Sequence, residues 1–203
     1  VSFDIEVDVS DSFPNLEEAD NPITSIAYKS SKSSTFHLLG LKDYDRNATI
    51  TDIDPENINF IKFDSEIRLL QHFVELWCSD YPDVVTGWNV EFFDIQYIVT
   101  RIIRECGEER AKRLSPWKNI QKRTREMFDR VQSTYNITGV AIIDYMDAFK
   151  KFGYKYGTQE SYKLDHIGYT VLGEKKLDYS EYGSLTALYD QNPQLYLDYN
   201  LQD

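Results

Sequence analysis

Hydrophobic and polar residues alternate along the start of the chain. The odd positions from Val1 to Val7 are all apolar, whereas the even positions are Ser2, Asp4 and Glu6. Because successive side chains of a strand point to opposite faces, this pattern predicts a strand with one apolar and one acidic face. Further strands are predicted near residues 23–29, 35–39, 83–88 and 140–145, the last as a buried strand.

Helical spacing of apolar residues separates these strands. It predicts helices over residues 64–79 and 92–106, and a short helix that ends near residue 152. Asp64 is the expected N-cap of the first helix. Residues 161–203 are expected to form two or three short helices, with Ser161 and Asn192 as N-caps and Pro193 at a first helical position. Strands interleaved with helices predict an α/β domain whose mixed sheet is flanked by helices.

Two connecting stretches differ in composition from these elements. Residues 10–22 are rich in acids and turn formers and are expected to form a loop. Residues 117–138 mix basic, polar and β-prone residues, which favours an extended β-hairpin inserted at about 118–138. The chain opens inside a strand and stops inside a helix, so we expect one domain, residues 1–203, cut from a larger protein.

Charge is unevenly distributed in this acidic chain of 203 residues and net charge −12. Residues 101–130 hold ten Lys and Arg against five Asp and Glu, so this window carries +5 and the remainder −17. A basic stretch on an acidic body suits an enzyme that binds metal cations and a polyanion, although a solvated helix face is an equally good interpretation for any single residue.

The lengths of the apolar runs and the two cysteines bear on where the protein is located. No apolar run approaches the roughly 20 residues that span a bilayer, so no membrane partner is expected. Cys78 and Cys106 each fall in a predicted helix and are expected to be reduced, buried thiols rather than a disulfide or a metal site, which favours a cytoplasmic protein.

Asp4 and Glu6 are the first candidate chemical pair. Residues two apart in a strand share a face, so both carboxylates are expected to project together. An acid-x-acid pattern arises about six times by chance at this composition, and an acidic strand edge facing water is the alternative.

Two later acids extend the pattern. Asp94 is expected in the first turn of the helix that follows strand 83–88, a place where sites of α/β folds gather, although capping of that helix is the alternative. Tyr199 and Asp203 lie four apart and therefore on one helix face, where a simple surface pair is the commoner case.

In this order, the three fragments resemble the exonuclease motifs of family B DNA polymerases. The fragments are Asp-Ile-Glu at 4–6, Asn-x₃-Phe-Asp at 89–94 and Tyr-x₃-Asp at 199–203. The resemblance spans nearly the whole chain and is strongest to the replicative polymerases of T-even-type bacteriophages. It also covers AKRLSP at 111–116, IDYMDAFKKF at 143–152 and SYKLDHI at 161–167. The family belongs to the tyrosine subgroup of the DEDD exonucleases, so the resemblance implies a ribonuclease H-like fold.

The resemblance also implies a two-metal site. Asp4, Glu6, Asp94 and Asp203 would hold two Mg²⁺ or Mn²⁺ ions, with Asp94 acting mainly through water. Such hard cations prefer carboxylate oxygen, and the three histidines of the chain show no ligand spacing. Tyr199 would orient the attacking water through its hydroxyl. The expected activity is 3′→5′ proofreading hydrolysis of a DNA primer.

Other residues follow from the same resemblance. Lys176, with Lys175 as its competitor, would stabilise charge at the scissile phosphate. Phe13 would stack on the frayed 3′ end, with a local hydrophobic anchor as the alternative. Asn89 is a candidate contact to the substrate backbone or sugar, with a turn residue as the alternative. Arg123 belongs to the hairpin that would separate primer from template. The implied partners are a frayed or single-stranded primer end, the other domains of the polymerase and, through them, a sliding clamp. For a viral protein the compartment would be the host cytoplasm.

Two alternatives remain open from the sequence. A stand-alone DEDD exoribonuclease would keep the fold but act on RNA. A non-catalytic scaffold of the same fold would bind partner proteins without turnover, although all four acids and the tyrosine are present.

Overall fold

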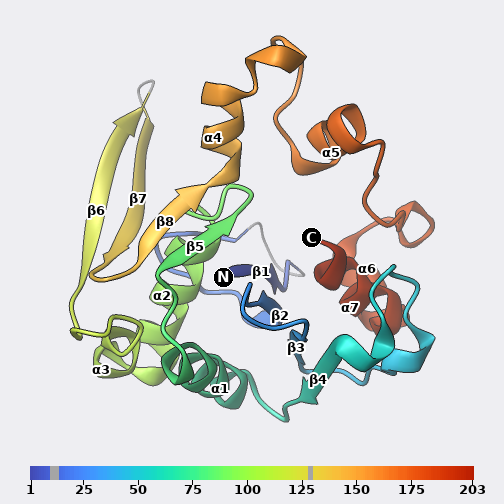
Figure 1. Ribbon diagram of the computed structural model, residues 1–203. Helices are drawn as coiled ribbons and strands as arrows, with labels where there is room; N and C mark the ends of the chain where they lie inside the picture. The colour runs from blue at the N-terminus through green and yellow to red at the C-terminus, as the bar shows by residue number, and fades with distance from the viewer. Residues whose placement is uncertain (10–13, 128–129) are drawn as a thin grey trace.

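The computed structural model describes residues 1–9, 14–127 and 130–203. Within these residues, six strands form one mixed sheet in the order β4-β3-β2-β1-β5-β8 (Figure 1). The strands are β1 (Ser2–Val7), β2 (Ile23–Lys29), β3 (Phe36–Gly40), β4 (Ile58–Lys62), β5 (Val84–Gly87) and β8 (Ala141–Asp144). The pairs of β2 with β1 and β3 are antiparallel, and the other pairs are parallel.

β1 lies near the middle of this sheet because its alternating sequence fits a position between two layers. Its apolar side chains are buried, and Asp4 and Glu6 project from the other face, as predicted. Asp4 pairs with Ala27 of β2 and Glu6 with Ser25. The two carboxylates are therefore fixed on one face of the sheet by the backbone of its central strands.

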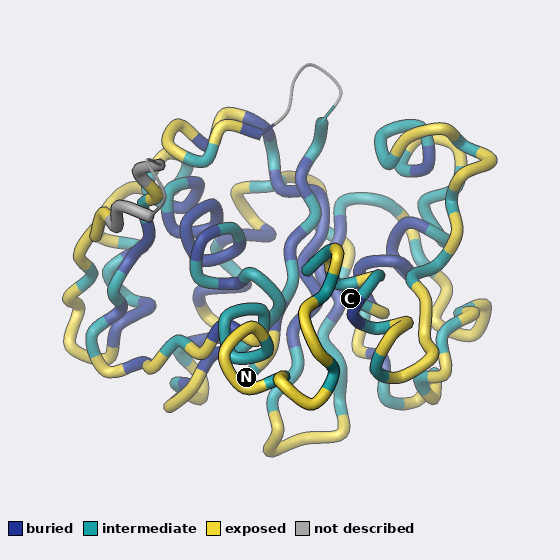
Figure 2. Tube along the Cα trace, turned by 90° about the horizontal axis from the view of Figure 1, so that it is seen from above, coloured by how far each residue is buried: buried dark blue, intermediate teal, exposed yellow. Residues whose placement is uncertain are grey.

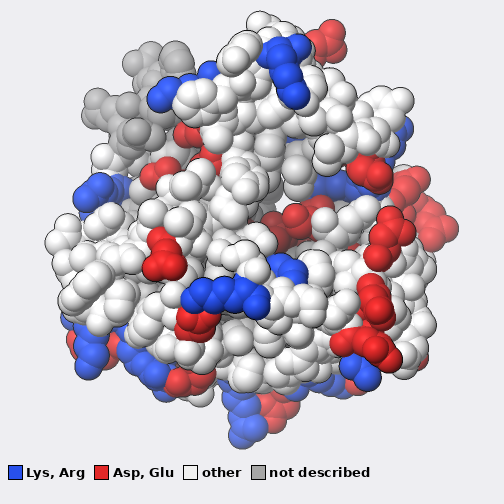
Figure 3. Space-filling view, in the orientation of Figure 1, with Lys and Arg blue, Asp and Glu red and all other residues white. Residues whose placement is uncertain are grey.

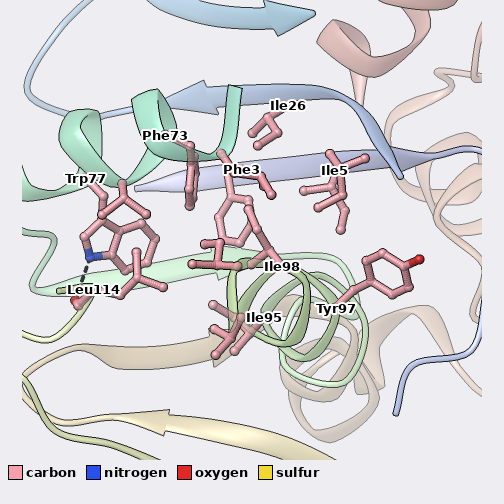
Figure 4. Packing of buried hydrophobic residues seen from close by; sticks show 14 of the residues in the cluster. Phe3, Ile5, Ile26, Phe73, Trp77, Ile95, Tyr97, Ile98 and Leu114 are labelled. Carbon is pink, nitrogen blue, oxygen red and sulfur yellow. Dashed lines mark hydrogen bonds between the residues drawn. The ribbon is translucent and has the colours of Figure 1, made fainter. Parts of the chain in front are cut away.

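Three helices cover the apolar face of β1: α1 (Glu66–Ser79), α2 (Asp94–Cys106) and α3 (Glu108–Lys112). Figure 4 shows Phe3 of β1 against Phe73 and Trp77 of α1, with ring centroids 5.6 and 6.1 Å from that of Phe3. The indole Nε1 of Trp77 donates to the carbonyl of Leu114 at 2.8 Å, so its one polar atom is satisfied in the core. This layer forms the main hydrophobic core.

Two helices near the C-terminus cover the acidic face. α6 (Leu185–Gln191) and α7 (Pro193–Gln202) pack on Ala27, Leu38 and Ile58 and form a second hydrophobic cluster. Asn192 caps α7 as predicted, since its side chain accepts from the N–H of Leu195, and Pro193 is the first helical residue. The end of α7 thus points its last residues at β1.

The remaining elements lie around and above the sheet. β6 (Ile120–Met127) and β7 (Arg130–Ile137) pair antiparallel as a separate sheet. α4 (Tyr145–Phe152) and α5 (Leu164–Leu172) stand on either side of a gap above β1, and Figure 2 shows the same region from above. Short 3₁₀ helices are η1 (Arg46–Ala48), η2 (Pro55–Asn57), η3 (Tyr154–Tyr156) and η4 (Ser180–Tyr182).

Several sequence predictions need correction. α1 begins at Glu66 with Ser65 as N-cap, so Asp64 is not the cap. α5 begins at Leu164 after Lys163, three residues beyond the predicted cap Ser161. β8 is an edge strand and only Asp144 of it is buried, so the prediction of a buried strand was wrong.

Two elements were missed and two thiols were assigned broadly correctly. β4 and α3 were not predicted, because each has only five residues and the polar residues of β4, Asn59 and Lys62, do not alternate with apolar ones. Cys78 and Cys106 are free and partly buried.

In the described part of the chain, no helix is both long and apolar enough to cross a bilayer.

Candidate active site

Three carboxylates converge where β1 meets the end of α7. One oxygen each from Asp4, Glu6 and Asp203 lie within 4.8 Å of one another. Asp4 and Glu6 come from the acidic face of β1, and Asp203 directly follows α7, where its N–H donates to the carbonyl of Tyr199. Residues almost 200 positions apart in the chain thus form one cluster of oxygen ligands.

Asp94 lies beside this cluster rather than inside it. It is the first residue of α2 and is 3% exposed. Its Oδ1 accepts from the N–H of Ile5, between Asp4 and Glu6, at 3.2 Å. Asp94 is thus bonded to β1 itself, which brings all four predicted acids to one place.

The electrostatics of the cluster are unfavourable without a cation. Burial, and then the charge of Asp203, raise the pKa of Asp4 to about 7. Burial, followed by the charge of Asp4, raises the pKa of Glu6 and that of Asp94 well above their usual values. A divalent cation would neutralise this mutual repulsion, and an all-oxygen donor set fits a hard ion. The residues present therefore fit a divalent metal site.

Lys176 connects the cluster to Tyr199. Its Nζ donates to the Tyr199 hydroxyl at 3.1 Å and also to Oδ2 of Asp203. Burial alone would lower the pKa of Lys176, but the charge of Asp203 and its hydrogen bond outweigh burial and raise it. Lys175 instead places its Nζ 4.7 Å from the ring centre of Tyr169. Of the two lysines, Lys176 is therefore the one that contacts the acidic cluster and Tyr199.

Tyr199 stays a hydroxyl at neutral pH in this environment. It is 7% exposed, and burial, together with the charge of Asp203, raises its pKa to about 12. Because Lys176 donates to the phenolic oxygen, the hydroxyl hydrogen is available for another acceptor.

Two polar residues that the sequence did not single out hold this arrangement in place. Asn200 is fully buried on α7, and its Nδ2 donates to Oδ2 of Asp4 at 2.9 Å. Asp144 accepts from the N–H groups of Asn89 and Glu91, each at 3.1 Å, and so fixes the loop that leads into Asp94. Asn200 lies three residues before Asp203 and so shares a helix face with it, which is a signal in the sequence. Asp144 ends β8 and is the N-cap of α4, which is the corresponding signal for that residue.

A cleft of about 650 Å³ opens above the cluster. Asp4, Tyr199 and Asp203 lie at one part of its lining, and Trp88 and Tyr162 at another. Figure 3 shows acidic and basic atoms inside a hollow in this region of the molecule. Asp4 and Asp203 are therefore accessible to a ligand from outside.

The predicted nucleic-acid contacts lie in different places. Asn89 lines the cleft and has a φ of 63°, in the left-handed region that asparagine tolerates better than most residues. Arg123 is exposed on β6 and does not line the cleft. Phe13 lies outside the described residues.

Comparison with known proteins gives a consistent result. The family described as DNA polymerase family B, exonuclease domain, matches residues 1–167. The DNA-directed DNA polymerase of Escherichia phage RB69 is 32% identical over the whole chain, and that of Enterobacteria phage T4 is 28% identical over 98% of it. The DNA polymerase catalytic subunit of Saimiriine herpesvirus 2 is 29% identical over 96% of the chain and 19% of its own length.

The chain spans about a quarter of the two phage relatives, 24% of each. The family match covers the strand that carries Asp4 and Glu6 and the helix that begins at Asp94. The alignment with the RB69 polymerase extends over α7 and Asp203 as well. The chain therefore belongs to the exonuclease-domain family of the family B DNA polymerases.

Proposed function

We propose that this domain is the 3′→5′ proofreading exonuclease of a DNA-directed DNA polymerase and releases nucleoside monophosphates from the 3′ end of a primer. The observation that carries the proposal is the cluster of Asp4, Glu6 and Asp203, of which Asp4 and Asp203 line an open cleft. The mixed sheet with helices on both faces supports a ribonuclease H-like fold.

The proposed cofactor is a pair of Mg²⁺ or Mn²⁺ ions. Asp4, Glu6 and Asp203 would hold them, with Asp94 contributing through water. When bound, the ions supply activation of the attacking water and stabilisation of the leaving 3′ oxygen. Metal ligands must be deprotonated, and a bound cation would keep these carboxylates ionised at neutral pH although burial and mutual repulsion raise their pKa values without it.

The chain's own groups complete the chemistry. Tyr199, protonated at neutral pH, would orient the attacking water by a hydrogen bond rather than remove its proton. Lys176 would place a positive charge beside the scissile phosphate. Asn89 would contact the substrate backbone in the cleft, and Phe13 would stack on the terminal base.

The β6–β7 sheet is proposed to separate primer from template. Lys122 and Arg123 are exposed on β6, which supports contact with DNA, and Lys122 also forms an ion pair with Glu17. In the parent protein we place the domain beside the polymerase domains and, through them, near a sliding clamp, in the cytoplasm of a cell or of the host.

The proposal is tested with a 5′-labelled single-stranded DNA oligonucleotide in Mg²⁺ or Mn²⁺. We expect a ladder that shortens from the 3′ end and disappears in EDTA. The Asp80→Asn protein, changed at an exposed acid that is ion-paired to Lys32, should give the same ladder. Faster shortening of a matched RNA would favour the exoribonuclease alternative, and no shortening of either by a folded protein would favour the scaffold.

Substitution of Lys176 by Met is expected to lower kcat roughly 100-fold, since it removes one stabilising donor at the phosphate. Mn²⁺ affinity should not fall, because the change removes a positive charge beside Asp203. Lys175→Met is the matched control and should retain nearly full activity. Single-turnover rates and a Mn²⁺ titration measure both effects, and equal losses in the two variants would contradict the assignment.

Substitution of Asn200 by Ala is expected to weaken Mn²⁺ binding roughly 10- to 100-fold. Partners that orient a metal ligand have effects of this size, and Asn200 donates to Asp4. Asp198→Asn is the control, because Asp198 is equally buried on α7 but accepts from Tyr44 and Thr49. It should lower the melting temperature without changing Mn²⁺ affinity. Unchanged Mn²⁺ binding in Asn200→Ala would show that the hydrogen bond does not position Asp4.

A further inference from the structure

A row of lysines and aromatic rings follows α4 away from the cleft. We call it the lysine–aromatic surface, and it consists of Lys150, Lys151, Phe152, Tyr154, Lys155 and Tyr156. Phe152 is 66% exposed and Tyr154 is 86% exposed. Aromatic side chains usually bury most of their area, so two that lie open together on one short segment suggest a ligand that covers them.

The lysines of this surface lie against rings rather than acids. Nζ of Lys151 lies 5.3 Å from the ring centre of Phe152, and Nζ of Lys155 lies 4.6 Å from that of Tyr156. Lys150 has one acidic neighbour, Asp147, at 3.8 Å. Among the described residues, Lys151 and Lys155 form no ion pair within 4.0 Å. Their charge is therefore available to an anionic partner, although the chain as a whole carries −12.

The surface is continuous with the cleft through a chain of rings. Phe149 lies 6.1 Å from Trp88 and 6.4 Å from Tyr162, both of which line the cleft. On its other side Phe149 stacks on Tyr156, with 19° between the ring planes and 5.7 Å between centroids. Met146, near the start of α4, lines the cleft. Figure 1 shows α4 rising from the end of β8, and Figure 3 shows Lys or Arg atoms at the upper end of the molecule.

The exposed rings and lysines of this surface, and its connection to the cleft, suit one kind of partner. Exposed rings next to lysines suit single-stranded nucleic acid, because bases stack on the rings and phosphates attract the ammonium groups. α4 has eight residues and is therefore about 12 Å long, which is roughly three nucleotides at 3.4 Å or more per phosphate. We propose that the lysine–aromatic surface binds the single strand several nucleotides before its 3′ end, an inference that rests on the proposed function.

The contribution of this surface to binding is expected to depend on the length of the oligonucleotide. A strand of three nucleotides ends inside the cleft, whereas one of twelve also reaches Phe152 and Tyr154. A triple variant, Lys150→Gln, Lys151→Gln and Lys155→Gln, and a double variant, Phe152→Ser and Tyr154→Ser, should each weaken binding of dT₁₂ about tenfold. Binding of dT₃ should change less than twofold. The triple variant should also lower the salt slope of dT₁₂ binding by up to about 2, since each phosphate contact contributes about 0.7.

A second triple variant serves as the charge-matched control. Lys32, Lys42 and Lys62 form ion pairs with acids at 2.7, 3.9 and 2.7 Å, and none of them lines the cleft. Their replacement by Gln changes net charge equally and should leave dT₁₂ affinity within twofold of wild type. Fluorescence anisotropy in EDTA measures binding, and thermal melting confirms that all variants fold.

Hydrolysis of the same oligonucleotides in Mn²⁺ separates the two proposals. If the wild type shortens both oligonucleotides but the surface variants keep the wild-type kcat/KM on dT₁₂, the lysine–aromatic surface does not bind the strand and the proposed function stands. A surface that instead contacts another protein domain would give this result. Equal loss on dT₃ and dT₁₂ would also overturn the inference. If the wild type shortens neither, the proposed function itself fails.

Discussion

The Asp4→Asn protein is expected to lose at least about 1,000-fold in the rate of 3′ hydrolysis and to become more heat-stable than the wild type without metal. Asp4 accepts from Asn200 and lies beside Glu6 and Asp203, so its loss removes one of the proposed metal ligands. The same substitution also removes a charge that burial and Asp203 disfavour.

The raised pKa of Asp4 determines at which pH the wild-type protein is destabilised relative to Asp4→Asn. The pKa of Asp4 is raised from 3.8 to about 7 in the folded protein, so folding favours the protonated acid. The associated stability is fully present below about pH 4 and is lost as the pH rises through about 7. Because one pKa unit corresponds to about 1.4 kcal/mol, the cost at pH 8 is at most roughly 4 kcal/mol.

Thermal melting in EDTA at pH 4 and pH 8 measures the effect. The advantage of Asp4→Asn should be small at pH 4 and reach several degrees at pH 8, and saturating Mn²⁺ should stabilise the wild type more than the variant. Equal melting temperatures at pH 8 would show that the ionised Asp4 side chain does not destabilise the folded protein.

The Arg101→Met protein is expected to lose about 3–5 kcal/mol of folding stability, or roughly 10 °C in melting temperature. The guanidinium of Arg101 is buried and donates to both carboxylate oxygens of Glu66 at 2.7 Å. It also donates to the carbonyls of Ala19 and Asp20, at 2.8 and 3.0 Å. Without it, the buried charge of Glu66 loses its cationic partner, and the loop before β2 loses two of its hydrogen bonds to α2.

Arg104→Met provides the control for this substitution. Arg104 is on the same helix, about half exposed, and contacts the carbonyl of Glu18 and, at 3.6 Å, Glu105. Its loss should cost less than about 1 kcal/mol. Adding Glu66→Leu to Arg101→Met should recover part of the stability, because the unpaired charge is removed. Urea unfolding measures all four proteins, and a loss below 1 kcal/mol for Arg101→Met would contradict this account.

The alternation of β1 predicted the acidic face of the sheet because one residue of strand register decides which side chains are buried. The helical spacing of apolar residues predicted α1 and α2 as helices, because residues three and four apart share the one helix face that packs on the core. Helix ends were less predictable. Asp64 and Ser161 were predicted as N-caps, but the caps are Ser65 and Lys163, and neither of these side chains makes a capping hydrogen bond, so cap chemistry in the sequence does not locate these two helix ends.

The four acids were predicted from the sequence because their motifs come in a recognisable order, and the structure brings them together. Their hydrogen-bond partners were not. Asn200 and Asp144 are ordinary polar residues in sequence, and their importance comes from contacts with Asp4 and with the loop at Asn89. Lys175 and Lys176 are adjacent and chemically identical, so only the fold, which turns one toward Tyr199 and the other toward Tyr169, distinguishes them.

The most direct test of the central claim is the location of manganese in the folded domain. Anomalous diffraction from crystals soaked in Mn²⁺ is predicted to show ions in contact with Asp4, Glu6 and Asp203, and no ion there in Asp4→Asn crystals soaked in the same way. Manganese bound elsewhere in the wild type, or bound equally at this site in both proteins, would contradict the assignment of these carboxylates as the metal centre of the exonuclease.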